Sequence, residues 1–499
     1  MAAVDWLAWS ADAFARARAE GKPVLLSITA PWCGSSSEMD RTTFADAGVA
    51  GVLNERFVAI RVDADRSPDI AERYSLGGWP TTAFLTSNGD IAGGGTFVSL
   101  DRMPAVLDRV LDAFRSRSDE LMSATGDVRT TPASSNGSAT ADAVPEHDLV
   151  DRVYESYDTA HGGFGTAPKF PLTAPLDLAL DTFLTTRDSR MAHIVQSTLD
   201  AIGWGALFDE VDGGFFRCAA THDWQSPHTA KLLETNAALL RIFIAAADVL
   251  KSARYRERAA EILRYAQTWL ADQADGGWAG SQRADDGYYA SAAAQRQARQ
   301  PPPIDRTLFT SANALMVSAV LRAALAIDDT ALGEFALRSL ERVSLAAYKP
   351  GAGIAHYVDD RGPHGRGLLD DQIAMASAQL DAFDATGNIV YEMMAEELVQ
   401  FAVRTMWDER EGGFFDRSEL AELERIGLMR TRLKPFVANC EAARVLRRLT
   451  EATGAHDFAD RSNVTLSAMA RVAPGQGPLA AHYLLASAKA PQSASKPLE

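Results

Sequence analysis

The chain has 499 residues, of which 47% are hydrophobic and 23% are charged, a composition typical of folded proteins with a sizeable core. At roughly 100–200 residues per domain, this length predicts two to four domains. The formal net charge of −17 disfavours binding to the phosphates of nucleic acid or to an anionic membrane surface, so we expect neither as a partner.

The N-terminus and the cysteines favour a cytoplasmic location. Asp5 stands where a signal peptide needs basic residues, and no long apolar stretch follows it. The most apolar stretches, 236–250 and 311–327, are interrupted by Arg241 and Arg322, so we expect no membrane span. The three cysteines are far apart in the sequence and odd in number, which argues against a disulfide framework.

Residues 1–115 alternate strand and helix patterns. Short β-branched stretches predict strands, and apolar residues at helical spacing predict helices between and after them. The expected strands are 22–29, 57–63, 81–86 and 91–98, and the expected helices are 38–54 and 101–115. This order is that of a thioredoxin-like α/β domain, which we place at 1–115. Residues 116–146 are rich in Ser, Thr, Ala, Asp and Gly without apolar periodicity, which predicts a linker.

From residue 147 onward, long helical patterns dominate and a Gly-Gly-aromatic element recurs. Its copies are Gly162-Gly163-Phe164, Gly213-Gly214-Phe215, Gly276-Gly277-Trp278 and Gly412-Gly413-Phe414, with Gly351-Ala352-Gly353-Ile354 as a degenerate copy. A period of roughly 50–70 residues fits one helical hairpin per repeat. We therefore expect an all-α (α/α)6 toroid over 147–485, with the loops at one mouth forming the ligand site, and a disordered tail at 486–499. An open helical solenoid is the alternative.

Strings of residues along nearly the whole chain match a known family. In the first half they are Val4-Asp5-Trp6, Lys22-Pro23, Asn54-Glu55-Arg56-Phe57 and Gly77-Gly78-Trp79-Pro80. In the second half they are the continuous stretch 161–171, Asp223-Trp224 with Pro227-His228, and Leu369-Asp370-Asp371. The chain resembles the YyaL and spermatogenesis-associated protein 20 family. This resemblance implies a thioredoxin-like domain fused to a six-hairpin toroid similar to N-acylglucosamine 2-epimerases and related glycan enzymes.

The first candidate site is a thiol centre at Cys33. The family usually carries Cys-His-Trp-Cys-His between the first strand and helix, so Cys33 takes the position of the first cysteine and Ser36 that of the second. At a helix N-terminus, unpaired N–H groups would stabilise a Cys33 thiolate. Pro80 resembles the cis-proline that faces such a cysteine in thioredoxin folds. We therefore assign catalytic roles to Cys33, Ser36 and Pro80.

Ser36 limits what this site can do. A hydroxyl cannot resolve a mixed disulfide, so cycling between a dithiol and an intramolecular disulfide is excluded at Cys33 and Ser36. Cys218 or Cys440 could take this role only within disulfide reach of Cys33, which the sequence does not show. Three interpretations fit: a monothiol exchange centre that works with a small-molecule thiol or a protein thiol, a peroxide-sensing thiol, or an inactive scaffold.

The second candidate site is the toroid cavity, where a carbohydrate isomerase or epimerase needs an acid and a base beside the carbon whose proton moves. His228, just before a helical pattern, is the catalytic candidate, although a lone histidine is more often structural. The family tends to carry Pro-His-Phe-Glu-Lys where this chain has the string 227–231, Pro-His-Thr-Ala-Lys, so the family's acid is missing. The expected substrate-binding residues of both sites are Trp32, Trp79, His161, Trp224, Lys231, Asn313, Asp370 and Asp371.

We expect neither a cofactor nor a metal, because the sequence contains no phosphate loop, nucleotide fingerprint or zinc-ligand spacing. The leading hypothesis is a monothiol redox or thiol-exchange role for Cys33, with the toroid holding a substrate or partner. The alternative is a carbohydrate isomerase or epimerase activity in the toroid cavity, with a carbohydrate as ligand. A non-catalytic binding protein is the third interpretation.

Overall fold

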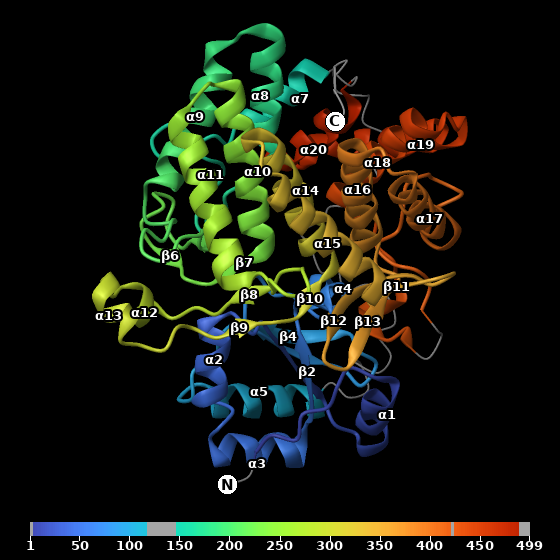
Figure 1. Cartoon of the computed structure of the whole chain (residues 1–499). Coiled ribbons are helices and arrows are strands. Elements are labelled where there is room, and N and C mark those ends of the chain that lie inside the picture. Colours follow the sequence, from blue (N-terminus) through green and yellow to red (C-terminus); the bar gives the residue numbers. More distant parts are fainter. Residues whose placement is uncertain (1–2, 117–145, 421–423, 489–499) are drawn as a thin grey trace. The chain divides into compact units, whose positions relative to one another are not determined.

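The computed structural model describes residues 3–116, 146–420 and 424–488 (Figure 1). The chain forms two compact units, Met1–Ser135 with Glu419–Arg432 and Asn136–Ser418 with Leu433–Glu499. Of the predicted linker, only the end residues 116 and 146 are among the described residues. Most of the predicted tail, from residue 489 onward, also lies outside them. Residues 486–487, which we expected in that tail, instead form the end of the last helix.

The first unit is built on a four-stranded sheet of order β2-β1-β3-β4, in which β1 and β2 are parallel and the other neighbours antiparallel. Its strands are β1 (Val24–Thr29), β2 (Val58–Asp63), β3 (Thr81–Leu85) and β4 (Ile91–Gly95). Its helices are α1 (Ala11–Glu20), α2 (Gly34–Arg41), α3 (Ala47–Arg56), α4 (Pro68–Tyr74) and α5 (Met103–Ser116), with the short turn η3 (Gly427–Arg430). This is the thioredoxin-like order that the sequence predicts, with α1 added before the first strand.

The single helix expected over 38–54 is in fact two helices, α2 and α3. The side chain of Asp46 accepts hydrogen bonds from the N–H groups of Gly48 and Val49, so it caps the start of α3. Met39 of α2 and Val49 of α3 lie in the same hydrophobic core. The apolar spacing therefore runs through the break, and only the capping carboxylate reveals where the second helix begins.

Residues 419–432, far along the chain, complete the first unit. The hydroxyl of Tyr74 donates to the carbonyl of Gly89 at 2.7 Å and accepts from the N–H of Leu428 at 2.8 Å. Burial raises the pKa of this hydroxyl, which therefore remains a donor across the physiological pH range. Our predicted boundaries placed these residues in the toroid, and no pattern in the sequence assigns them to the first unit.

We expect the substitution Gly427→Ala to destabilise the first unit by about 2–4 kcal/mol. Gly427 has a positive φ of 51°, its N–H donates to the carbonyl of Asn88 at 3.0 Å, and a Cβ on it would overlap the Gly89 carbonyl and the Tyr74 hydroxyl. Gly21→Ala is the matched control, because Gly21 also has a positive φ, 62°, but no atom within 4 Å of a Cβ. Hydrogen exchange of the β1 amides measures both, and equal losses would contradict the contact.

The second unit is a closed ring of helix pairs (Figure 1). The inner helices, in ring order, are α8 (Ala174–Thr186), α10 (Leu233–Val249), α14 (Thr310–Ile327), α16 (Leu369–Thr386), α18 (Phe436–Thr453) and α20 (Ala480–Ser487). Their outer partners are α9 (Ser189–Gly203), α11 (Ala253–Tyr265), α15 (Thr330–Ala347), α17 (Ile389–Met406), α19 (His456–Ala470) and α7 (Glu146–Tyr154). Because α20 packs against both α8 and α7, the last helix closes the ring and pairs with the first. The predicted (α/α)6 toroid is confirmed, and the open solenoid is wrong.

Short strands and turns lie in the connections between the ring helices. The longest are β12 (Gly353–Asp359) and β13 (Gly362–Arg366), which form a hairpin before α16. The other strands are β5 (Cys218–Ala219), β6 (Pro227–His228), β7 (Lys231–Leu232), β8 (Ser281–Gln282), β9 (Ile304–Asp305), β10 (Leu308–Phe309) and β11 (Tyr348–Lys349). The short helices are η1 (Ala266–Leu270), α12 (Asp286–Tyr289), α13 (Ala293–Gln297), η4 (Ala473–Gly475) and η5 (Gly477–Leu479).

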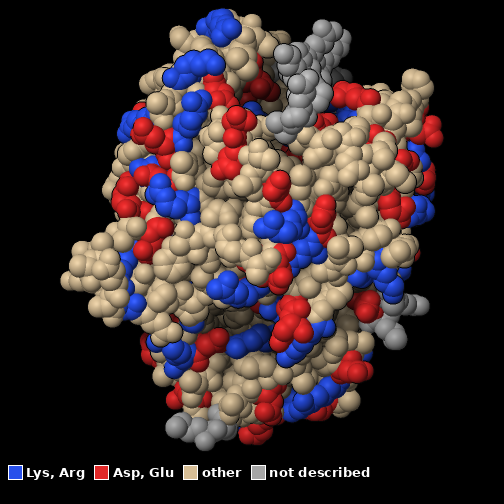
Figure 2. All heavy atoms as spheres, viewed as in Figure 1, with Lys and Arg blue, Asp and Glu red and all other residues tan. Residues whose placement is uncertain are grey.

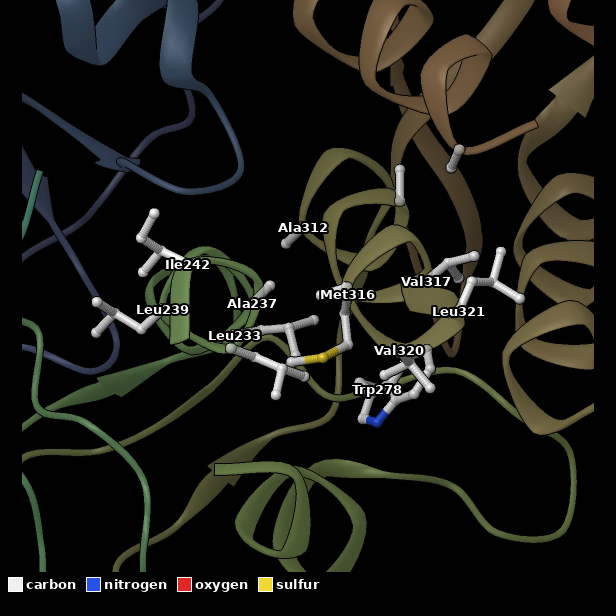
Figure 3. Close-up of a cluster of buried hydrophobic side chains, with 14 of the residues drawn as sticks. Leu233, Ala237, Leu239, Ile242, Trp278, Ala312, Met316, Val317, Val320 and Leu321 are labelled. Atoms are coloured by element: carbon white, nitrogen blue, oxygen red, sulfur yellow. The ribbon is translucent and has the colours of Figure 1, made fainter. Parts of the chain in front are cut away.

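The core of the ring is formed by apolar residues of both the inner and the outer helices. Figure 3 shows Met316 of α14 beside Leu233 and Ala237 of α10, with Trp278 next to Val320. The helix α14 is long and apolar enough to cross a membrane. In this structure, however, it packs between α10 and α16, and 61% of it is buried. A largely apolar helix is expected in the inner layer of such a ring, between two neighbouring inner helices.

Charged side chains of both signs are spread over the face of the molecule shown in Figure 2. Acidic and basic residues lie interspersed among uncharged ones on this face, without a broad area of a single sign. Interspersed charges of this kind form no extended positive surface on this face.

Candidate functional site

Cys33 is the N-cap residue of α2, and its side chain is half-buried. Its Sγ lies 3.6 Å from the carbonyl oxygen of Trp79, and the peptide bond between Trp79 and Pro80 is cis. Trp32 is buried, and its Nε1 donates to Asp65 at 2.7 Å, which fixes the segment just before the thiol. The structure therefore brings together Cys33 and the Trp79–Pro80 segment, although they are far apart in the sequence.

Ser36 faces the interior of the first unit. Only 3% of it is exposed, and its Oγ accepts from the N–H of Ala30 at 3.4 Å. The hydroxyl of the neighbouring Ser37 donates to the carbonyl of Cys33 at 3.2 Å. Both hydroxyls therefore hold the turn between β1 and α2, and a catalytic role for the Ser36 hydroxyl stays a prediction.

The other two cysteines, Cys218 and Cys440, are fully buried in the second unit. Burial raises the pKa of both thiols, and the positive charge of Arg217 only partly opposes this at Cys218. A protonated, inaccessible thiol is a poor nucleophile. While the second unit is folded, neither cysteine can take over the resolving role that Ser36 cannot fill.

A second cluster of titratable side chains lies at the first turns of α10 and α16. Glu234 belongs to α10 and Asp371 to α16, and His356 comes from β12. The Nδ1 of His356 lies 2.8 Å from Oδ2 of Asp371, and the two residues are 8% and 1% exposed. Oδ1 of Asp371 is also buried, with no hydrogen-bond partner among the described residues. The carboxylate therefore orients the His356 ring and keeps one oxygen unsatisfied.

Glu234 and His228 have pKa values that are shifted toward each other. Glu234 is exposed at the surface, but the groups packed around it desolvate its carboxylate and raise its pKa, against the opposing charges of Arg217 and His356. Desolvation, followed by the charge of Arg217, lowers the pKa of His228, while Asp286 acts in the opposite direction. A protonated carboxyl and a neutral imidazole are thereby favoured, which are the forms that a general acid and a general base need.

One repeated arrangement, which we call the clasp, holds the Gly-Gly-aromatic loops. The N–H of the loop's last residue donates to a side-chain amide oxygen in the first turn of the next inner helix, and the amide nitrogen donates back to that residue's carbonyl. The pairs are Phe215 with Asn236, Trp278 with Asn313, Ile354 with Gln372, and Phe414 with Asn439. The degenerate copy at 351–354 therefore forms the same pair of hydrogen bonds as the three regular copies. The side-chain amide of Asn313 is hydrogen-bonded to the backbone of Trp278, and only 1% of the residue is exposed. Asn313 therefore has a structural role here, whereas we expected it to contact a substrate.

Lys231 is also part of the repeat. Its Nζ donates to Asp209 at 2.7 Å and to the carbonyl of Gly213 at 2.6 Å, and the residue is fully buried. Lys434 makes the same two kinds of contact, to Asp408 and to a glycine carbonyl of the last loop. Each lysine stands five residues before its clasp asparagine. This spacing is visible in the sequence and indicates a structural lysine, whereas we predicted a substrate-binding one.

His161 and Trp224 lie together at the loop before α8. Trp224 is buried, and its Nε1 donates to the carbonyls of His161 and of the next residue at 3.2 Å each. The Nδ1 of His161 lies 3.3 Å from the carboxylate of Asp158. Asp370 is exposed on α16, directly before Asp371. Trp224 therefore anchors a loop, and a substrate contact by His161 or Asp370 stays a prediction.

Arg217, whose charge acts on both Glu234 and His228, is missing from the residues we predicted, whereas Glu234 and His356 were among the polar and histidine candidates for the toroid cavity. Glu234, Ser311 and Asp370 each stand two residues before a clasp amide, in three successive inner helices. This shared register of polar residues supports Glu234 as a candidate. Arg217 and His356 lie in short strands and loops, where no periodicity marks them. Among the described residues, no three His, Cys, Asp or Glu side chains are placed to hold a metal ion.

We expect Asn313→Ala to lower the stability of the second unit by about 2–4 kcal/mol, because it leaves the N–H and C=O of Trp278 buried without partners. Asn463→Ala, at an exposed position of α19, is the control and should be nearly neutral. Chemical unfolding followed by circular dichroism measures both. An Asn313→Ala protein as stable as the control would show that the clasp is not the role of Asn313.

Comparison with known proteins agrees with this architecture. Residues 1–131 match the family described as "Protein of unknown function, DUF255" (Thioredox_DsbH). Spermatogenesis-associated protein 20 of Mus musculus is 28% identical over 298 residues, which is 55% of this chain and 38% of that protein's own length. Thioredoxin-1 of Drosophila melanogaster is 31% identical over 74 residues, which is 15% of this chain and 66% of that protein. The match thus spans well under half the length of the first of these relatives.

Among solved structures, cellobiose 2-epimerase from Bacillus thermoamylovorans is similar with a TM-score of 0.53 and 9% identity, covering 64% of this chain and 85% of the epimerase. At that identity the likeness shows the fold alone, and the fold is the ring of helix pairs. The chain is thus similar in sequence to spermatogenesis-associated protein 20 over 55% of its length, and its ring has the fold of the epimerase.

Proposed function

We propose that this protein carries out monothiol exchange at Cys33. The observation that carries the proposal is that Cys33 is more exposed than the other groups that could take part in thiol exchange. Cys33 is half-buried at the start of α2, whereas Ser36, Cys218 and Cys440 are buried. The contact between Cys33 and the Trp79 carbonyl, beside a cis-proline, and the likeness to thioredoxin-1 support thiol–disulfide chemistry at this place.

The reaction needs only a disulfide and a thiol as co-reactants. The Cys33 thiolate attacks one sulfur of a disulfide R–S–S–R′, forms a mixed disulfide with R–S, and releases R′–S⁻. A second thiolate R″–S⁻ then attacks the sulfur of R, forms R–S–S–R″, and returns Cys33 as a thiolate. Because Ser36 cannot resolve the mixed disulfide, the intermediate persists until the external thiol arrives. In this proposal the helical ring holds the substrate or partner.

Oxidised glutathione tests the proposal. We expect the native protein to gain one glutathione at Cys33, with Cys218 and Cys440 unmodified until the protein is unfolded, because both are fully buried. The variant Ser36→Cys should instead form a disulfide between Cys33 and the introduced cysteine and lose the adduct, since it restores the resolving sulfur. Intact mass and peptide mapping read both outcomes.

Ser35→Cys is the matched control for this experiment. Ser35 is exposed next to Ser36, so the variant adds a thiol without the resolving position. We expect it to retain the glutathione adduct on Cys33. A wild-type protein that gains no adduct at Cys33, or a Ser36→Cys protein that keeps it unchanged, would contradict monothiol exchange.

A second candidate function, sugar isomerisation or epimerisation, is favoured by the His356–Asp371 pair and its neighbours. Such a reaction removes a proton from the carbon beside a carbonyl and returns one to the same or the adjacent carbon. A neutral His228 would accept the proton, a protonated Glu234 would donate to the carbonyl oxygen, and Asp371 would hold His356 oriented toward the sugar. The likeness of the ring to a cellobiose 2-epimerase supports this class of substrate.

Proton exchange in deuterium oxide tests this second function. We expect label to enter C2 of an aldose from a panel that includes cellobiose and mannose. The rate should rise with pH as His228 becomes neutral and fall as Glu234 loses its proton, which gives a bell-shaped profile. Glu234→Gln should slow exchange about 100-fold or more and remove the alkaline limb. Cys33→Ser should leave exchange unchanged, and a sugar that binds without exchange would argue against the function.

A further inference from the structure

The first unit contains a pocket of about 460 Å³ beside β4 that plays no part in the thiol site. Its lining includes apolar residues of α5 and of the strands and adjoining turn, among them Phe84, Phe97, Val106, Val110 and Phe114. None of Cys33, Trp79 and Pro80 contributes to it. The volume falls within the range of small-molecule sites, about 300–1,000 Å³, and is too small for a folded partner.

The glycines of β4 keep this pocket open. Gly93 pairs with Phe84 and Gly95 pairs with Thr82, and both partners line the pocket. Directly paired residues of neighbouring strands project to the same face of a sheet, so side chains at 93 and 95 would point into the pocket. A Cβ at either position would have no atom within 4 Å, and neither glycine has a positive φ. The fold therefore does not require glycine at these positions, whereas an open pocket does.

Two arginines give the pocket a positive wall. α5 buries Met103, Leu107 and Leu111 against the core, and the adjacent stripe that begins at Arg102 and includes Arg109 faces the pocket. No Asp or Glu lines the pocket, and among the described residues neither arginine forms an ion pair. In a chain with a net charge of −17, two arginines without acidic partners beside an apolar pocket favour an anion.

We propose that this pocket binds an amphipathic molecule with an apolar chain and an anionic head group, such as an aliphatic carboxylate. The chain lies against Phe84, Phe97 and Val110, where it is removed from water. The head group lies at the arginine side, where a guanidinium can pair with a carboxylate. The site is separate from the proposed thiol exchange, so loss of one leaves the other intact.

Calorimetric titration of the full chain with three ten-carbon probes tests the assignment: decanoate, decanol and decyltrimethylammonium, each below its micelle concentration. We expect decanoate to bind at least fivefold more tightly than decanol, and decyltrimethylammonium to bind most weakly. Gly93→Leu should weaken decanoate binding at least tenfold, because it places a side chain in the pocket. Gly51→Leu is the matched control, since Gly51 is exposed on α3 with no atom within 4 Å of a Cβ, and it should bind as the wild type does.

No decanoate binding at 1 mM, equal binding by Gly93→Leu and wild type, or equal affinity for all three probes would overturn the proposal. The double variant Arg102→Gln with Arg109→Gln should bring decanoate affinity down to that of decanol, and an unchanged preference would exclude the arginines. If Gly93→Leu does not fold, Gly95→Ala, which adds a single methyl group on the same wall, replaces it and should weaken binding at least threefold.

Discussion

The clasp between each loop and the next inner helix is the constraint on which the second unit depends. A buried loop must find partners for its backbone N–H and C=O groups, and one side-chain amide, as both acceptor and donor, satisfies both groups of a single residue. The same amide nitrogens of Asn236, Asn313 and Asn439 also donate to the carbonyl four residues earlier, at the start of their helices. A loop therefore cannot move without opening the first turn of its helix, so residues next to a clasp are held on a rigid support.

The copy of the repeat that departs most from the pattern is the one that carries the His356–Asp371 pair. Three loops use asparagine, whereas the copy at 351–354 uses Gln372 and continues into the β12–β13 hairpin. That hairpin supplies His356, and the residue before Gln372 is Asp371, so the altered clasp and the His–Asp pair share one piece of backbone. Local rules are most often broken where a protein has a functional demand, and the unsatisfied oxygen of Asp371 lies at this place.

The sequence predicts the order of the elements and the ring, because both depend on periodicity, which survives in any single sequence. It does not separate a polar residue that contacts a ligand from one that satisfies buried backbone. Asn313 and Lys231 have the composition of site residues, but their partners, Trp278 and Asp209, lie well away in sequence and are fixed only by the closed ring. Glu234 was within reach of the repeat register, whereas Arg217 was not.

The unit that carries the thiol site includes a part of the chain that no sequence pattern connects to it. The chain leaves α4 at Tyr74 and reaches Trp79, whose carbonyl faces Cys33, within five residues. Tyr74 is held by aromatic contact with Trp9 and by the N–H of Leu428. Tyr74, five residues before Trp79, is therefore anchored in part by residues 419–432. Because that segment is flanked on both sides by residues of the second unit, the thioredoxin-like unit is complete only when nearly the whole chain is present.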